Sequence, residues 1–75
     1  MNIKKIIGQV IKEARIKKNI KSQDLADEFS VGLATVQGWQ RGEVLPPAEN
    51  FLKVCTYLDI DVNEILKIIK VLEKD

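Results

Sequence analysis

The sequence has no histidine and a single cysteine, Cys55, among its 75 residues. One cysteine cannot form an intrachain disulfide, and without a Cys/His cluster the chain offers no ligand set for zinc. Histidine is the side chain whose ordinary pKa lies closest to neutrality, so its absence removes the commonest general acid or base. A glycine-rich phosphate loop after a strand is also missing, as is any strand pattern. We therefore expect no enzymatic activity, no metal and no cofactor.

Long apolar runs are missing as well. No window approaches the roughly 20 apolar residues of a membrane-spanning helix. The N-terminus lacks the apolar region, roughly 7–15 residues long, of a signal peptide. These absences predict a cytoplasmic protein with no membrane partner. The length predicts a single domain, residues 1–75, and a domain this small buries only about 60% of its unfolded surface.

Charge is unevenly distributed along the chain, although the net charge is only +1. Residues 1–21 carry seven basic residues against Glu13 alone, a local charge of +6, whereas residues 22–75 have a local charge of −5. Such asymmetry can orient a protein on a polyanion even when the total is near zero. A solvated charged helix gives the same pattern, so charge alone does not decide between the two interpretations.

Residues 22–41 are predicted to form two short helices joined by a tight turn. Apolar residues recur at helical spacing on both sides of that turn, at Leu25, Ala26, Phe29, Val36 and Trp39. The stretch 30–32 between them is polar and contains glycine, which disfavours one continuous helix. The outer face of the second helix, 33–41, bears no acidic residue. A helix that enters a groove of DNA needs such a face.

This segment resembles the helix-turn-helix of the Cro/XRE family, the λ-repressor-like DNA-binding domains of phage and bacterial regulators. The residues that carry the resemblance are Leu25-Ala26, Phe29, Val31, Val36, Trp39 and Arg41-Gly42. Further matches extend it over residues 3 to 66, at Ile6-Gly8, Ile11, Arg15, Pro47, Phe51-Leu52, Leu58, Ile60-Asp61 and Ile65-Leu66. The resemblance implies an all-α fold, a compact five-helix λ-repressor-like domain with a helix-turn-helix.

The pattern places the five helices at residues 3–18, from 22 onward, 33–41, 47–58 and 62–73. Asn19 is expected to adopt a left-handed cap conformation, Gly42 to end the third helix and Asp61 to cap the fifth. The fourth helix is predicted to bury Phe51, Leu52, Val54, Cys55 and Leu58. The fifth is predicted to place Val62, Ile65, Leu66 and Ile69 in the core.

The resemblance also implies which residues contact DNA. Positions that face the groove in the family correspond to Leu33, Ala34, Gln37 and Gly38. Among these, Gln37 is the one side chain that can make a bidentate base contact, most naturally to adenine. Phosphate contacts are expected from Lys18, Lys21, Ser22, Gln23, Thr35 and Arg41. These contacts position the protein, whereas the base contacts specify sequence.

The chain departs from the family pattern at two positions. The family usually has Gln where this chain has Ser22. In the family that Gln braces the recognition helix, the helix that enters the DNA groove, which corresponds to residues 33–41 here. Either Ser22 or the next residue, Gln23, is expected to take over the role. The family usually has Gly where this chain has Ser30. Either Ser30 takes the left-handed conformation, at roughly 1–2 kcal/mol, or Gly32 shifts the turn.

Two features of the predicted recognition helix, its contact with the first helix and the glycine inside it, have alternative interpretations. Arg15 and Gln40 occupy positions where related proteins pair an Arg with a Glu, so we expect a hydrogen bond that ties the first helix to the recognition helix. Arg15 as a member of a solvated basic face is the alternative. Gly38 inside the helix indicates either tight packing or fraying, or close approach to DNA.

The fifth helix carries more apolar residues than one core face can use. Ile68, Val71 and Leu72 remain, and exposed apolar surface on a small domain usually has a partner. We expect a homodimer interface there. The sequence therefore predicts a sequence-specific regulator of transcription, a repressor that binds double-stranded DNA. The alternative is a protein-interaction module such as an antitoxin or anti-repressor, whose apolar surface binds a different protein.

Overall fold

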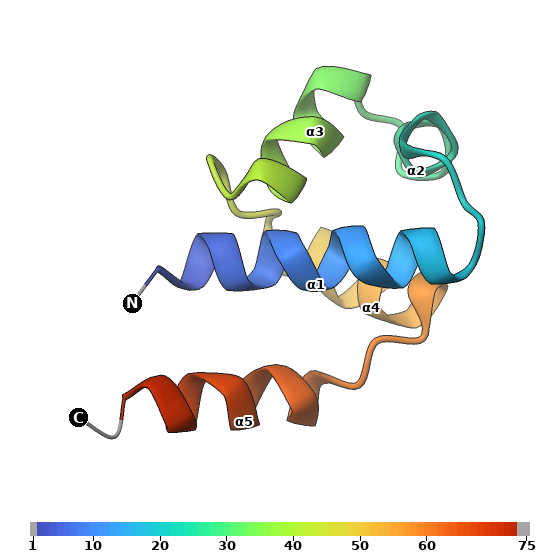
Figure 1. Ribbon diagram of the computed structural model, residues 1–75. Coiled ribbons are helices and arrows are strands. Elements are labelled where there is room, and N and C mark those ends of the chain that lie inside the picture. Colours follow the sequence, from blue (N-terminus) through green and yellow to red (C-terminus); the bar gives the residue numbers. More distant parts are fainter. Residues whose placement is uncertain (1, 74–75) are drawn as a thin grey trace.

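The computed structural model describes residues 2–73, which form five α-helices (Figure 1). They are α1 Ile3–Lys17, α2 Ser22–Glu28, α3 Leu33–Arg41, α4 Ala48–Leu58 and α5 Val62–Leu72. The all-α prediction is confirmed, and the predicted bounds differ by at most one residue. Pro47 precedes α4 as its N-cap instead of opening the helix. The two ends of the expected domain 1–75, Met1 and residues 74–75, lie outside the described residues.

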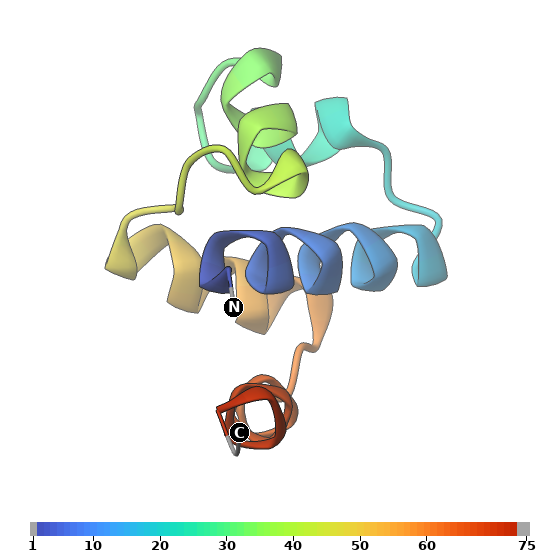
Figure 2. The same ribbon diagram turned by 60° about the vertical axis from the view of Figure 1, so that its left-hand side comes forward.

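The long helix α1 lies in the middle of the molecule. In Figure 1, α2 and α3 lie on one side of α1, and α5 runs along the opposite side. Figure 2 shows α5 end-on beneath α1 and α4. The helix-turn-helix and the last helix therefore occupy opposite ends of a molecule whose extents are 39 × 22 × 21 Å.

The core is built where the first four helices meet. Its fully buried residues are Ile11, Leu25, Ala26, Val36, Trp39, Val54 and Leu58. The largest of them is Trp39 of α3, which is 1% exposed. Cys55 is also buried, as expected of a small core residue, and burial raises the pKa of its thiol. A protonated thiol is a poor nucleophile, which argues against a reactive role for Cys55. We therefore interpret Cys55 as a residue that fills space in the core.

The crossing of α1 and α3 depends on Gly8, whose role the sequence pattern did not reveal. A Cβ atom added there would lie 2.7 Å from the carbonyl oxygen of Gln40, and closer still to that of Trp39. Any side chain at this position would push the two backbones apart. Gly8 thus fixes the separation between the central helix and the recognition helix.

The predicted helix ends are confirmed. Asn19, two residues after the end of α1, and Gly42, directly after α3, both have positive φ, 58° and 74°. The Asp61 side chain accepts a hydrogen bond of 2.9 Å from the backbone N–H of Asn63 at the start of α5. Ser30 also has a positive φ, 53°, so Ser30 itself forms the left-handed turn and Gly32 does not replace it.

Two residues predicted to lie in the core are exposed, so that part of the prediction was wrong. Leu52 is 61% exposed because α4 buries the face that holds Val54, Cys55 and Leu58, and Leu52 lies outside that face. Leu66 is 50% exposed. The reason is that α5 packs mainly against one helix, α1, and only its Ile65 is fully covered.

Candidate nucleic-acid interface

The helix α3, which the sequence predicts to be the recognition helix, presents a polar and aliphatic outer face to solvent. Val36 and Trp39 point into the core, whereas Leu33, Ala34 and Gln37 are exposed on the other side. Leu33 is 36% exposed. Thr35 is exposed as well, as expected of a phosphate contact. This division follows from the 3.6-residue period of the helix, because the inward residues are three apart.

Gly38 is the one predicted base-contacting residue that is covered. It is nevertheless not enclosed, since an added Cβ would meet nothing closer than the Glu43 Oε1 atom at 4.0 Å. That distance is an ordinary van der Waals contact. Tight packing around a Cβ position therefore does not explain why glycine stands inside α3.

A chain of hydrogen bonds ties α3 to both neighbouring helices. The Arg15 Nε atom donates to Gln40 Oε1 at 2.9 Å, which confirms the predicted tie. Gln40 Nε2 in turn donates to Ser22 Oγ at 2.9 Å. Arg15 also donates through Nη1 to the carbonyl oxygen of Ile20, at 2.9 Å. The network is partly buried, and it fixes the orientation of α3 relative to α1 and α2.

This network decides between the two candidates for the bracing role. Ser22 is the first residue of α2 and accepts the hydrogen bond from Gln40. Gln23 instead donates to Asp27 Oδ1 at 2.9 Å, along its own helix. Asp24 caps the start of α2, because its carboxylate accepts a 2.9 Å hydrogen bond from the backbone N–H of Lys21. Ser22 is therefore the brace, and Gln23 is exposed on the surface of α2.

A small open hollow of about 170 Å³ lies where α1, α2 and α3 meet at the candidate interface. Lys12, Ser22, Gln37, Gln40 and Arg41 line it. Three of these were predicted to contact DNA, so the fold brings residues from α2 and α3 together as expected. Lys12 was missed. Its position three residues before Arg15, on the same side of α1, is the signal that could have identified it.

Two of the predicted phosphate contacts are engaged elsewhere. Lys18, at the end of α1, forms an ion pair with Asp59 in the turn between α4 and α5. Arg41, the last residue of α3, pairs with Glu43. The hydrogen bonds and the charge of Arg41 lower the pKa of the Glu43 carboxyl, and Glu43 correspondingly raises the pKa of Arg41. Lys21 is exposed.

The α5 residues predicted for a dimer form one exposed strip. Ile68, Val71 and Leu72 are 41%, 68% and 49% exposed. Together with Glu64 and Lys67 they line a shallow groove of about 260 Å³. Leu66 adds further exposed apolar surface to the same helix.

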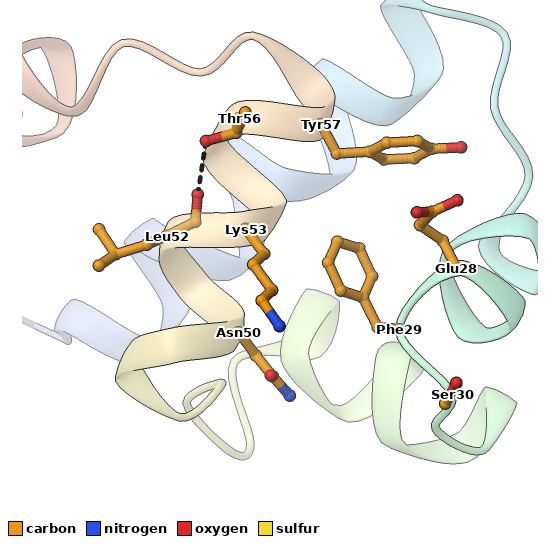
Figure 3. A pocket seen from close by; sticks show the side chains of 8 residues that line it. All are labelled: Glu28, Phe29, Ser30, Asn50, Leu52, Lys53, Thr56 and Tyr57. Atoms are coloured by element: carbon orange, nitrogen blue, oxygen red, sulfur yellow. Dashed lines mark hydrogen bonds between the residues drawn. The ribbon is translucent and has the colours of Figure 1, made fainter.

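A larger hollow of about 650 Å³ lies between the end of α2 and the outer side of α4 (Figure 3). Phe29 and Tyr57 meet there edge to face, with 5.9 Å between ring centroids. The side chain of Thr56 folds back onto the carbonyl oxygen of Leu52 at 3.0 Å. None of the residues predicted to contact DNA or to form the dimer appears in its lining, so this hollow is separate from the candidate interface.

Residues 2–73 contain no group of three or more His, Cys, Asp or Glu side chains arranged to hold a metal ion. None of the helices in the same range combines the length and the apolar composition that crossing a bilayer requires.

Comparison with known proteins identifies the family. A family model described as helix-turn-helix matches residues 11–65, more than half of the chain. That range contains α2 to α4, the second half of α1 from Ile11 onward and the start of α5. Comparisons with curated proteins and with solved structures give no significant match. The chain therefore belongs to the Cro/C1-type helix-turn-helix family, the XRE family of DNA-binding transcription regulators.

Proposed function

We propose that this protein is a sequence-specific transcriptional repressor that binds double-stranded DNA as a homodimer. Each protomer inserts α3 into the major groove, which is wide enough to admit an α-helix. Two recognition helices about 34–36 Å apart would then contact successive turns of the duplex on one side.

The observation that carries the proposal is the bracing of an exposed, acid-free α3 by the Arg15–Gln40–Ser22 network. A reading helix must be held rigidly, because a poorly fixed helix cannot place its side chains against base edges. The network achieves this from the side of α3 that faces the protein, so the outer face stays free.

The roles of the contacting residues follow from their side chains. Gln37 is the bidentate reader, with a preference for adenine, while Leu33 and Ala34 detect thymine methyl groups. Gly38 lets the DNA approach the helix backbone. Phosphate oxygens are bound by a group around this face and along α1, made up of Lys18, Lys21, Ser22, Gln23, Thr35 and Arg41. Lys12 joins this group because it lines the same hollow as Ser22 and Arg41.

One hydrogen-bonding reader per half-site gives modest discrimination, so a dimer is needed to double the number of bases read. We assign the dimer interface to Ile68, Val71 and Leu72 of α5. These residues belong to α5, which lies on the opposite side of α1 from α3 (Figure 1), so pairing through them leaves α3 uncovered.

Selection of bound duplexes from a random DNA library, at moderate salt, tests the proposal. The expected result is an enriched inverted repeat whose half-sites are about one or two helical turns apart. Folded protein that enriches no sequence would contradict it.

A second candidate function is a protein-interaction module on the same fold, such as an antitoxin or anti-repressor. The exposed apolar strip of α5 and the aliphatic Leu33 and Ala34 favour it. The salt dependence of DNA binding separates the two functions. A steep loss of DNA affinity with rising salt indicates release of counterions from neutralised phosphates, which the repressor requires.

A further inference from the structure

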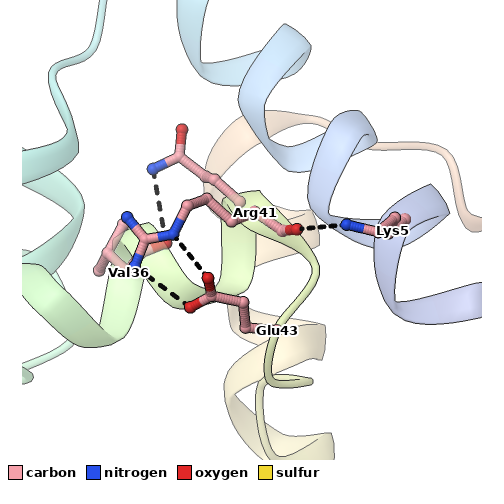
Figure 4. A network of polar contacts seen from close by, with 5 residues as sticks. Lys5, Val36, Arg41 and Glu43 are labelled. Carbon is pink, nitrogen blue, oxygen red and sulfur yellow. Dashed lines mark hydrogen bonds and ion pairs between the residues drawn. The ribbon is translucent and has the colours of Figure 1, made fainter.

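The guanidinium group of Arg41 is hydrogen-bonded to an acidic residue of the same chain. Its Nε atom donates to Glu43 Oε2 at 3.1 Å, and its Nη2 atom donates to Glu43 Oε1 at 3.2 Å (Figure 4). Both side chains are more than half exposed. The one arginine of the recognition helix therefore points its guanidinium at a carboxylate in the free protein.

The backbone holds Glu43 in this place. Gly42 turns the chain back at the end of α3, and the N–H of Glu43 donates to the carbonyl oxygen of Gly38 at 3.0 Å. Lys5 approaches from α1, where its Nζ atom donates to the carbonyl oxygen of Arg41 at 3.3 Å and its charge further lowers the pKa of Glu43. The negative charge of Glu43 thus lies beside Gly38, next to the face that we assign to DNA.

A carboxylate and a phosphate compete for the same guanidinium. The forked N–H groups of arginine match the two oxygens of either anion, and donors aimed at one anion cannot also be aimed at the other. A DNA phosphate must therefore either displace Glu43 or bind the N–H groups of Arg41 that Glu43 leaves free, and in both cases the negative charge of Glu43 lies nearby. Because an exposed pair of this kind is weak, the competition lowers affinity without preventing binding.

We propose that Glu43 is an intramolecular competitor of DNA phosphate for Arg41, which lowers the affinity of the protein for DNA of any sequence. The inference rests on the proposed function above. Phosphate contacts supply nearly all of non-specific binding. The Arg41–Glu43 pair therefore weakens the part of the DNA affinity that does not depend on sequence. The base contacts then make up a larger part of the total affinity for DNA.

Binding to a labelled mixed-sequence duplex of about two helical turns (~20 bp) tests this. Fluorescence anisotropy would be followed over a series of salt concentrations for the wild type and for Glu43→Gln. The matched control is Glu13→Gln, which removes the same charge from α1 at the hollow between α1 and α5, away from α3. In Glu13→Gln the hydrogen bond from Gln9 can persist.

Glu43→Gln should bind roughly two- to fivefold more tightly near 0.1 M salt, as expected for releasing an exposed pair. The log–log salt dependence should become steeper by at most about one unit, because the charge of Arg41 is no longer offset by the carboxylate of Glu43. Glu13→Gln should differ little from the wild type. In an Arg41→Ala background, Glu43→Gln should lose most of its effect, since the competition acts through Arg41.

Three results would overturn the inference while leaving DNA binding intact. Glu43→Gln could match the control, or it could bind more weakly, which would mean that Glu43 orients Arg41 for binding. Its gain could also persist unchanged in the Arg41→Ala background, which would indicate a general charge effect. A wild type without salt-dependent DNA binding contradicts the proposed function itself, so the two failures are distinguishable.

Discussion

Arg15 ties α3 to the segment between α1 and α2. Its guanidinium joins Gln40 of α3 to the carbonyl oxygen of Ile20, which lies between α1 and α2. Both partners are only partly exposed, so neither can be fully hydrated once the arginine is removed. A buried or half-buried polar group without a partner costs more than the net value of the lost hydrogen bond.

Arg15→Ala is therefore expected to lower the free energy of unfolding by about 1–3 kcal/mol. Chemical denaturation measures the change. Lys17→Ala is the control, because it removes an exposed basic residue from the same helix and should change stability by less than about 0.5 kcal/mol. Equal unfolding free energies for the wild type and Arg15→Ala would show that the tie does not stabilise the fold.

Gln37 is the residue that we propose to read a base. Gln37→Ala should cost about 1–3 kcal/mol on the preferred duplex and relax the preference at one base pair. The measurement is binding to the selected site and to its single-base variants. Gln23→Ala, on the surface of α2, should instead weaken binding to all these duplexes equally. A Gln37→Ala protein with an unchanged base preference would remove Gln37 from the reading role.

At the scale of the helices, the two glycines Gly8 and Gly38 have opposite roles although both lie inside helices. A side chain at Gly8 meets the backbone of α3, whereas one at Gly38 has room. Gly8→Ala should destabilise the protein by at least about 1–3 kcal/mol through overpacking. Gly38→Ala should stabilise it by up to about 1 kcal/mol through helix propensity.

Thermal and chemical unfolding of the two glycine variants measure these changes, and each variant is the control for the other. A destabilised Gly38→Ala protein would mean that the helix needs glycine for its own structure. A stabilised variant that binds DNA more weakly would support glycine as the point of close approach to DNA.

The helix α5 packs against the rest of the molecule mainly through Ile65 and leaves a longer apolar strip uncovered. Val71→Lys places a charge in the middle of that strip and should weaken dimerisation by about 1 kcal/mol or more. Because Val71 is 68% exposed, the stability of the protomer should not change. Sedimentation equilibrium measures the association, with the exposed loop residue Val44 changed to Lys as control. A wild type that stays monomeric at every concentration would contradict the dimer.

Sequence periodicity predicted the helices well because each has a strong apolar face and clear end signals. Asn19, Gly42 and Asp61 mark ends that the structure confirms. Leu52 and Leu66 were misplaced because burial depends on which neighbours cover a helix, and the period of a single helix does not contain that information. Only the folded structure shows that α5 packs mainly against the single helix α1.

The candidate site was predicted in part, for similar reasons. The Arg15–Gln40 contact followed from the family pattern, but the choice of Ser22 over Gln23 required the crossing of α2 and α3. Lys12 and Glu43 were missed as members of the site. Glu43 comes close to Arg41 through the reversal of the chain after α3, which helical spacing does not encode. Lys12 comes close through the packing of α1 against α3, and only its spacing from Arg15 pointed to it.

At the scale of the whole molecule, the two proposed functional surfaces are separated by α1. The helix-turn-helix lies on one side of α1 and the apolar strip of α5 on the other (Figure 1). A two-fold dimer pairs identical patches, so the apolar strips of α5 from two protomers can pair with each other. The separation predicts that substitutions on α5 change the number of protomers bound without changing the bases read.

The most direct test of the central claim, that the outer face of α3 meets DNA, is a titration followed by NMR. A duplex recovered by selection would be added to ¹⁵N-labelled protein, and the amide signals would be mapped onto the helices. The largest changes are expected at Leu33, Ala34 and Gln37 and at the start of α2, with little change around Phe29 and Tyr57. Changes concentrated in the hollow between α2 and α4 or confined to α5, with α3 unaffected, would contradict it.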